Sequence, residues 1–255
     1  MTTLFNLTYY SFLTCGIAAL AAVMYFLTQL PQLTGRLRLL ALLNVGICTV
    51  SSVLHFYFFT RLQPLTAGTA GVAEMTSAIS SLPLVLRYVY WLATTLVLIS
   101  MFPLLMGLER VGMNFLRNLA LTDVGMIVTG YFGEYATHVH VGDGLPLFAL
   151  FWFTVSGLLF AYMTISIFEM LRRLPGSEMV PVQRDTLAYM FFFFLIGWSI
   201  FPAGFFYALV FDPSVSVVLR EFTVNVGDIV NKVIWGMLVV YTAVEIAKAE
   251  RNAAA

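Results

Sequence analysis

Charged residues are scarce in this chain. They make up 10% of its 255 residues, against about 25% in soluble domains, while 60% of the residues are apolar. Acids and bases also balance, at 13 of each. So little charge excludes an ordinary soluble domain and a basic nucleic-acid-binding surface. The composition is instead that of a protein whose surface lies in a lipid bilayer.

Cysteine and the usual signatures of enzymes are nearly absent as well. Only Cys15 and Cys48 occur, and both lie inside apolar runs, where they are expected to pack as small apolar residues. The sequence shows no internal repeat, phosphate-binding glycine loop, cluster of metal ligands or nucleophile motif. We therefore expect neither an enzyme nor a bound metal.

Long apolar runs, by contrast, follow one another along the whole chain. A helix needs roughly 20 apolar residues to cross about 30 Å of hydrocarbon, whereas a barrel would show alternating strands of about ten residues. The runs that meet the helical requirement are 7–29, 38–60, 84–106, 115–134, 147–170, 185–210 and 218–247. We predict an all-α membrane protein, a bundle of seven transmembrane helices that forms one domain over residues 1–255.

The basic residues predict the orientation of this bundle, because they concentrate on the cytoplasmic side of membrane proteins. If the N-terminus is outside, nine of the 13 basic residues border the cytoplasmic ends of the spans and three border the outer ends. We therefore expect an extracellular N-terminus and a multi-pass protein of the plasma membrane. The segment 61–83 then lies outside, where we expect a hairpin over the mouth of the bundle.

The remaining basic residue, Lys232, lies near the middle of the last span. A lysine at this depth costs about 2.5–3.5 kcal/mol on insertion scales, so it needs a partner and usually has a function. Asp228 precedes it by four residues on the same helix face. The pair either fixes helix packing as a buried ion pair, or consists of an amine condensed with an aldehyde to a Schiff base whose charge Asp228 holds.

The third span carries a second group of residues that could take part in the chemistry of the site. One helical face of its string RYVYWLATT carries Arg87, Tyr90, Trp91 and Thr94. We expect this face to point at Lys232, with Arg87 as a second cation near Asp228. An isolated arginine at a span end would instead be explained as a side chain that reaches the membrane interface.

Several motifs together resemble the microbial rhodopsins, and most closely the proteorhodopsin group. The strings RYVYWL, GYFGE, GWSIFPAGF and GDIVNK fall in this order on the third, fourth, sixth and seventh spans. The resemblance implies all-trans retinal bound to Lys232 as a Schiff base, with Asp228 as a counterion.

The same resemblance implies the surroundings of the chromophore. The Schiff-base region would contain Arg87, Tyr90, Thr94 and His55. The retinal pocket would contain Trp91, Thr95, Leu98, Trp152, Trp198, Phe201, Pro202 and Phe205. His55 would form a hydrogen bond toward the third span. Taken singly, each aromatic residue and the histidine are equally compatible with ordinary core packing.

The chain departs from the outward proton pumps of that group at two positions. Those pumps carry an aspartate where this chain has Tyr90 and a carboxylate donor where it has Met101. A phenol, whose reference pKa is about 10, does not serve as a resting proton acceptor as an aspartate does. Phe56 and Phe201 also replace tyrosines of the group, so we expect the Tyr90 hydroxyl to bond Asp228 and keep it ionised.

These departures favour a light-driven pump that moves protons inward, as in the mirror proteorhodopsins, which the chain resembles in lacking both acids. An ionised Asp228 is a poor final acceptor, so the proton would leave toward the cytoplasm and be replaced from outside. A sensory photoreceptor is the alternative. An anion pump is a weaker one, because Tyr90 fills the space that the ion would need. We further expect a homo-oligomer.

The central role of Lys232 predicts the loss of colour on its removal. Addition of retinal to membranes with the unmodified chain should give a visible absorption band, and Lys232→Ala should abolish it, because no other amine lies at this depth. Absorption spectra before and after bleaching measure the effect. A bleachable visible band that persists in Lys232→Ala would refute the attachment site.

Overall fold

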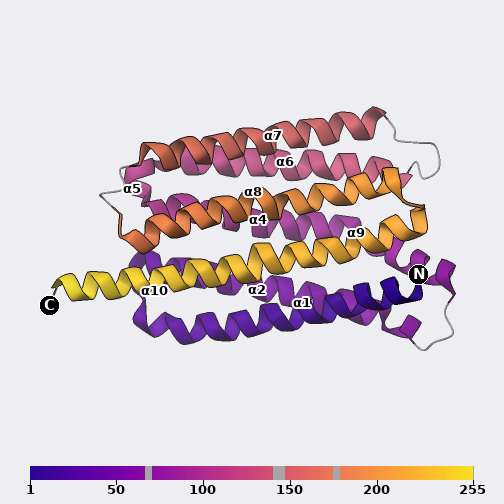
Figure 1. Cartoon of the computed structure of the whole chain (residues 1–255), viewed down its shortest axis with the longest axis horizontal. Coiled ribbons are helices and arrows are strands. Elements are labelled where there is room, and N and C mark those ends of the chain that lie inside the picture. Colours follow the sequence, from indigo (N-terminus) through magenta and orange to yellow (C-terminus); the bar gives the residue numbers. More distant parts are fainter. Residues whose placement is uncertain (67–70, 140–146, 175–178, 255) are drawn as a thin grey trace.

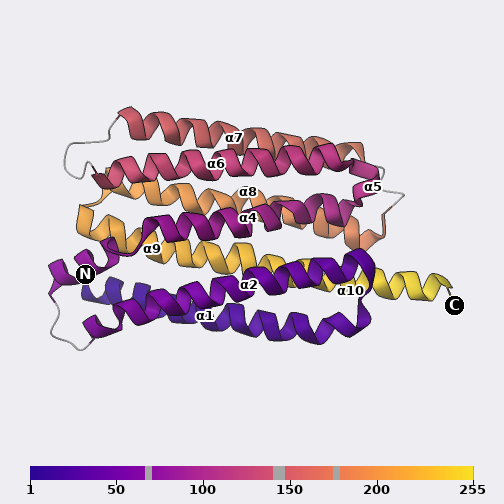
Figure 2. The same ribbon diagram turned by 180° about the vertical axis from the view of Figure 1, so that it is seen from behind.

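Long helices that lie side by side along one axis build this computed structural model, which describes residues 1–66, 71–139, 147–174 and 179–254 (Figures 1 and 2). The long helices are α1 (Thr2–Gln29), α2 (Gly35–Leu62), α4 (Leu84–Met106), α6 (Met113–Val139), α7 (Leu147–Arg173), α8 (Pro181–Val210), and a continuous run of α9 (Pro213–Asp228), a π-helical segment (Ile229–Ile234) and α10 (Trp235–Ala254). Each predicted span falls within one of these helices or within the last run. The prediction of an all-α bundle of seven transmembrane helices is confirmed.

Short helices connect the long ones at the two ends of the bundle. The 3₁₀ turns Leu30–Gln32 and Gln63–Thr66 follow α1 and α2, and α5 (Leu108–Val111) joins α4 to α6. Gly107 and Gly112 flank α5 with positive φ angles of 96° and 80°, a backbone conformation that glycine adopts without strain. The N- and C-termini lie at opposite ends of the bundle, as an odd number of spans requires (Figure 1).

The predicted hairpin in segment 61–83 is wrong in the part that the structure describes. Residues 72–80 form a helix, α3 (Val72–Ser80), at the N-terminal end of the bundle. Met75 and Ile79 lie four residues apart on one face of α3, and both are buried in an apolar cluster that also contains Val218 of α9. This helical spacing of two buried residues explains why the segment does not pair as strands.

The outward faces of the helices are apolar, as a lipid environment requires. Ile17, Leu121 and Ile196 are more than half exposed, whereas a water-soluble protein would bury most such side chains. Six of the described helical runs are long and apolar enough to cross a membrane. The equally long α6, which carries Arg117, Asp123 and Glu134, is not among these six.

The apolar core is divided into two clusters along the bundle. The cluster near the N-terminal end contains Phe5, Phe12, Phe58, Ile79 and Val218. The larger cluster toward the C-terminal end contains Phe26, Leu40, Met101, Phe102, Met190 and Trp235. Buried polar residues, including Ser51, His55, Asp228 and Lys232, lie between the two. The fold therefore places Lys232 and its polar neighbours between two apolar clusters.

Candidate functional site

Lys232 lies between the two apolar clusters, on the π-helical segment between α9 and α10. Its side chain is 1% exposed, and its amine donates a hydrogen bond to Asp228 Oδ1. Short π-helical segments inside α-helices often occur at functional sites, because they change the direction of a side chain within a continuous helix. A buried amine beside a carboxylate has the chemistry to form a Schiff base and to hold its positive charge.

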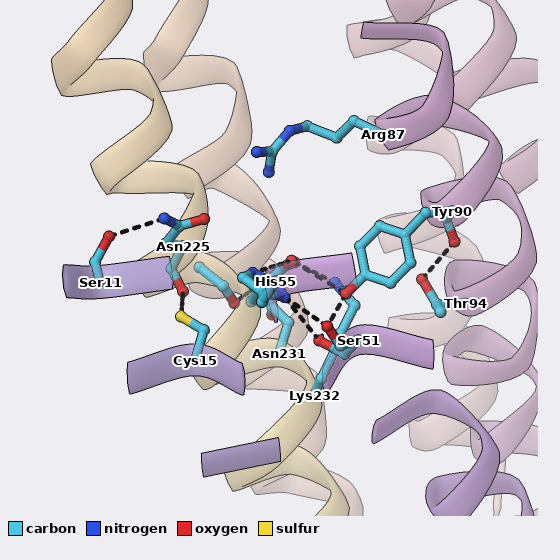
Figure 3. Close-up of polar contacts among 12 residues, drawn as sticks. Ser11, Cys15, Ser51, His55, Arg87, Tyr90, Thr94, Asn225, Asn231 and Lys232 are labelled. Carbon is cyan, nitrogen blue, oxygen red and sulfur yellow. Dashed lines mark hydrogen bonds and ion pairs between the residues drawn. The ribbon is translucent and has the colours of Figure 1, made fainter. Parts of the chain in front are cut away.

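Tyr90 of α4 faces this pair from the opposite side (Figure 3). Its hydroxyl lies 3.1 Å from Asp228 Oδ2 and 2.8 Å from Ser51 Oγ. A phenol has one proton to donate and an ionised carboxylate only accepts, so Tyr90 donates to Asp228 while the Ser51 hydroxyl donates to Tyr90. The predicted hydrogen bond from Tyr90 to Asp228 is thus present.

The ring of Tyr90 also occupies the space beside the amine. Lys232 Nζ lies 4.5 Å from the centre of the Tyr90 ring, within the range of a cation–π contact. Thr94, one turn further along α4, donates its hydroxyl to the Tyr90 carbonyl oxygen at 2.9 Å. Thr94 is therefore near the site but bonds its own helix.

The His55 ring lies edge-on to Tyr90 of the third span, with ring centres 6.4 Å apart, but among the described residues it forms no hydrogen bond to that span, contrary to our expectation. Its Nδ1 donates to the Ser51 carbonyl oxygen at 2.7 Å, which directs Nε2 toward Asp228 Oδ2 at 3.4 Å. The reason lies in the helix geometry, since Ser51 is one turn before His55 on α2 and fixes the plane of the imidazole. Asp228 is consequently surrounded by Lys232, Tyr90 and His55.

Asn231 secures the backbone next to Lys232. Its side-chain amide donates to the carbonyl oxygens of Gly197 and Gly227, at 2.9 Å each. A Cβ atom added at Gly197 would lie 2.2 Å from the Asn231 side-chain oxygen, so only glycine permits α8 to approach this closely. The glycine of the GWSIFPAGF string and the asparagine of GDIVNK thus act together.

Arg87 does not bond Asp228, although the sequence led us to expect a second cation there. Its guanidinium instead pairs with Glu221 of α9, and both side chains are almost fully buried. In Figure 3 Arg87 stands apart from the group formed by Tyr90, His55 and Lys232. The difference arises because Glu221 offers a carboxylate on the same helix, two turns before Asp228.

A cavity of about 970 Å³ opens between α4, α6, α7 and α8 and reaches Lys232. This volume lies at the upper end of the roughly 300–1,000 Å³ typical of ligand pockets. Its walls include most of the residues predicted for a chromophore pocket, namely Trp91, Thr95, Leu98, Trp198, Phe201, Pro202 and Phe205. It continues toward the N-terminal end of the bundle, where Ser80, Glu134, Ser216 and Arg220 line it.

Trp152, also expected in the pocket, does not line this cavity. Its ring packs against Phe132, Phe148 and Phe151. The neighbouring Phe153 lines the cavity instead and stacks on Phe205, with ring centres 4.1 Å apart. Consecutive helical residues point about 100° apart, so a displacement of one position changes the face entirely.

Three polar contacts of the site residues were not predicted from the sequence. Ser51 bonds Tyr90, Glu221 bonds Arg87, and Asp123 accepts a hydrogen bond from Thr95 at 2.8 Å. Asp123, on α6, is fully buried. The available signal was spacing, because Ser51 precedes His55 by four residues and Glu221 precedes Asp228 by seven.

Comparison with known proteins identifies the family of this chain. The family model described as bacteriorhodopsin-like protein matches residues 6–246, so the chain belongs to the bacteriorhodopsin-like family. A green-light absorbing proteorhodopsin from Gamma-proteobacterium EBAC31A08 is 25% identical over 164 residues, which cover 64% of this chain but only 62% of that protein. A blue-light absorbing proteorhodopsin from Gamma-proteobacterium Hot 75m4 is 24% identical over 89% of this chain and 82% of its own length.

Solved structures support the same assignment. The rhodopsin of Exiguobacterium sibiricum superposes with a TM-score of 0.77 at 25% identity and covers 95% of this chain and 98% of that one. Xanthorhodopsin, described as a light-driven ion pump with dual chromophore, superposes with a TM-score of 0.81 at 18% identity, over 97% and 96% of the two chains. At the latter identity, the likeness concerns the fold alone.

Retinal, linked through a Schiff base, is the chromophore of this family and the cofactor of this chain. The cavity fits such a group, because its walls are mainly aromatic and apolar while a buried amine closes one end. An elongated apolar aldehyde would place its chain against Trp91 and Trp198 and its carbonyl carbon at Lys232.

The pairing of Lys232 with Asp228 predicts how the pigment titrates. In Asp228→Asn the visible band should convert to a near-ultraviolet band at a pH lower by about 1–3 units, because the cation loses its carboxylate partner in a medium of low dielectric constant. Absorption spectra over a pH series measure the midpoint. Asp123→Asn is the matched control, since this buried carboxyl bonds Thr95, and its midpoint should stay near that of the unmodified chain. Equal titration of Asp228→Asn and the unmodified pigment would mean that another acid is the counterion.

Proposed function

We propose that this chain is a light-driven inward proton pump of the plasma membrane, with its N-terminus outside, in which Lys232 carries retinal and Asp228 is the counterion. The bound chromophore supplies light absorption and an isomerisation that re-aims the Schiff-base N–H. The observation that carries the proposal is the position of Tyr90, which bonds Asp228 at 3.1 Å and lies against Lys232 where outward pumps of the resembling group have an acid.

Asp228 is held in its ionised form by several groups at once. Lys232 and Tyr90 donate hydrogen bonds to its two oxygens, and the imidazole of His55 lies beside it. Hydrogen bonds and positive charge both favour a carboxylate over a carboxylic acid. Asp228 therefore serves as a permanent counterion rather than as the destination of a proton.

The outer half of the bundle offers no better acceptor in the part of the chain that the structure describes. The buried Glu221 and the partly buried Glu134 are already paired with Arg87 and Arg220. Neutralising either of them by a proton would leave a buried arginine without its full partner, which is costly. Outward movement of a proton released from the site is therefore energetically unfavourable.

The inner half contains neutral polar groups that can pass a proton on without binding it permanently. Asn44 is fully buried, and its side-chain oxygen has no hydrogen-bond partner among the residues that the structure describes. The hydroxyls of Thr186 and Thr242 lie 2.5 Å apart. Gln183 donates to the Leu105 carbonyl oxygen at 2.6 Å further along. These neutral groups can pass a proton through ordered water toward the cytoplasm.

Reprotonation from outside has a route in the cavity. The cavity is lined by Lys232 at one end and by Ser80 and Ser216 near the N-terminal end of the bundle. Near that end its lining includes the polar residues Ser80, Glu134, Ser216 and Arg220, whereas the core on the other side of Lys232 contains the apolar Met101, Phe102 and Trp235. Access from outside is therefore easier than access from inside, as inward transport requires.

This proposal predicts the sign of a light-induced pH change. Cells that contain the pigment, suspended in unbuffered salt, should make the medium more alkaline on illumination, and a protonophore should abolish the signal. A pH electrode measures both. A signal that the protonophore enhances would indicate an anion pump with passive proton entry, and no sustained change with a photocycle of seconds would indicate a sensor. Acidification of the medium would refute inward transport.

Two substitutions at Tyr90 provide the matched comparison. Tyr90→Phe keeps the ring and removes the hydroxyl, so it should retain the inward sign because no acceptor acid is created. Tyr90→Asp places an acid beside Lys232 and should weaken or reverse the signal. If Tyr90→Phe reversed the sign while Tyr90→Asp left it unchanged, the direction would not depend on an acid at this position.

A further inference from the structure

Glu221 joins two arginines on the N-terminal side of Lys232. One of its oxygens pairs with Arg87 of α4, and the other accepts hydrogen bonds from Arg220 Nη2 and Nε at 2.7 and 3.2 Å. The side chain of Glu221 is 2% exposed. A carboxylate buried this completely, with a different cation at each oxygen, is fixed in position.

Arg220 is anchored in turn on a third helix. Its Nη1 donates to Glu134 Oε1 of α6 at 2.7 Å, and the Tyr88 hydroxyl of α4 donates to the other oxygen of Glu134 at 2.6 Å. The result is a chain of alternating charge, Arg87, Glu221, Arg220 and Glu134, that links α4, α9 and α6. Two positive and two negative side chains balance within it.

Aromatic rings surround the Arg87 guanidinium, so few acids are within reach of its positive charge. Its guanidinium carbon lies 5.1, 5.9 and 6.0 Å from the ring centres of Phe58, Trp91 and Phe12. On α9, the next carboxylate on the same face as Glu221 is Asp228. It lies seven residues after Glu221, or roughly 10 Å along the helix axis. The long side chain of Arg87 can point toward either acid, and of the two it bonds Glu221.

We propose that Glu221 is a positioning residue that holds Arg87 away from Asp228, so that the charge of Asp228 is reserved for Lys232. The inference assumes the pigment of the proposed function but not its transport direction. The titratable and charged groups around Asp228 are Lys232 on its own helical run, Tyr90 and Arg87 of α4, His55 of α2 and Cys15 of α1. Of these, Arg87 is the one that a neighbouring acid draws away.

The acid titration of the visible band in the dark tests the role of Glu221. The band shifts when Asp228 takes up a proton, and in Glu221→Gln this should occur at a pH about one unit lower, because the released Arg87 approaches Asp228 and favours its ionised form. Glu134→Gln is the matched control, since Glu134 belongs to the same chain of charges without contacting Arg87, and its midpoint should move much less. An unchanged midpoint in Glu221→Gln would overturn the proposal.

A double variant separates positioning from general damage. In the Arg87→Gln background, Glu221→Gln should leave the midpoint where Arg87→Gln alone puts it, because the displaced cation is gone. A Glu221 effect of full size without Arg87 would overturn the proposal. If Glu221→Gln gives no pigment, Arg220→Gln/Glu221→Gln keeps the charges balanced and should show the same lowering. Outward transport by the unmodified chain would refute the proposed function and leave these titrations as they are.

Discussion

The contact between Lys232 and Asp228 is the constraint on which the rest of the structure depends. Two opposite charges in the middle of a membrane helix are stable only together, and only when the remaining lone pairs find donors. Tyr90 of α4 supplies one such donor, Ser51 of α2 orients the Tyr90 hydroxyl, and the His55 imidazole of α2 lies beside Asp228. The placement of Lys232 and its polar neighbours between two apolar clusters follows from the need to enclose this pair.

The buried basic residues Lys232 and Arg87 each pair with an acid of the last helical run, and these two acids lie two turns apart. Asp228 serves Lys232, and Glu221 serves Arg87 two turns away. A carboxylate at the position of Tyr90 would add an uncompensated negative charge, whereas a phenol adds a donor and no charge. The presence of Tyr90 in place of an aspartate therefore keeps the site neutral and also removes the proton acceptor that outward pumps use. In the proposed function, electrostatic balance and transport direction are therefore linked through Tyr90.

The seven spans and the buried lysine were predictable, because hydropathy over about 20 residues and one charge at bilayer depth are strong signals. The partners of individual side chains were not. Trp152 and Phe153 differ by one position, and which of them faces the cavity depends on the rotation of α7. Arg87 had two acids within reach, and its choice of Glu221 depends on the packing of α4 against α9. Such details follow from tertiary contacts that no local pattern encodes.

The most direct test of the account is whether Asp228 remains ionised throughout the light reaction. Light-minus-dark infrared spectra of the unmodified pigment and of Asp228→Asn measure this, because a protonated carboxyl group has a carbonyl band that a carboxylate lacks. We expect no such band that can be assigned to Asp228 at any stage after the flash. A carbonyl band that rises as the Schiff base loses its proton and is missing in Asp228→Asn would contradict the account, since Asp228 would then be the proton acceptor.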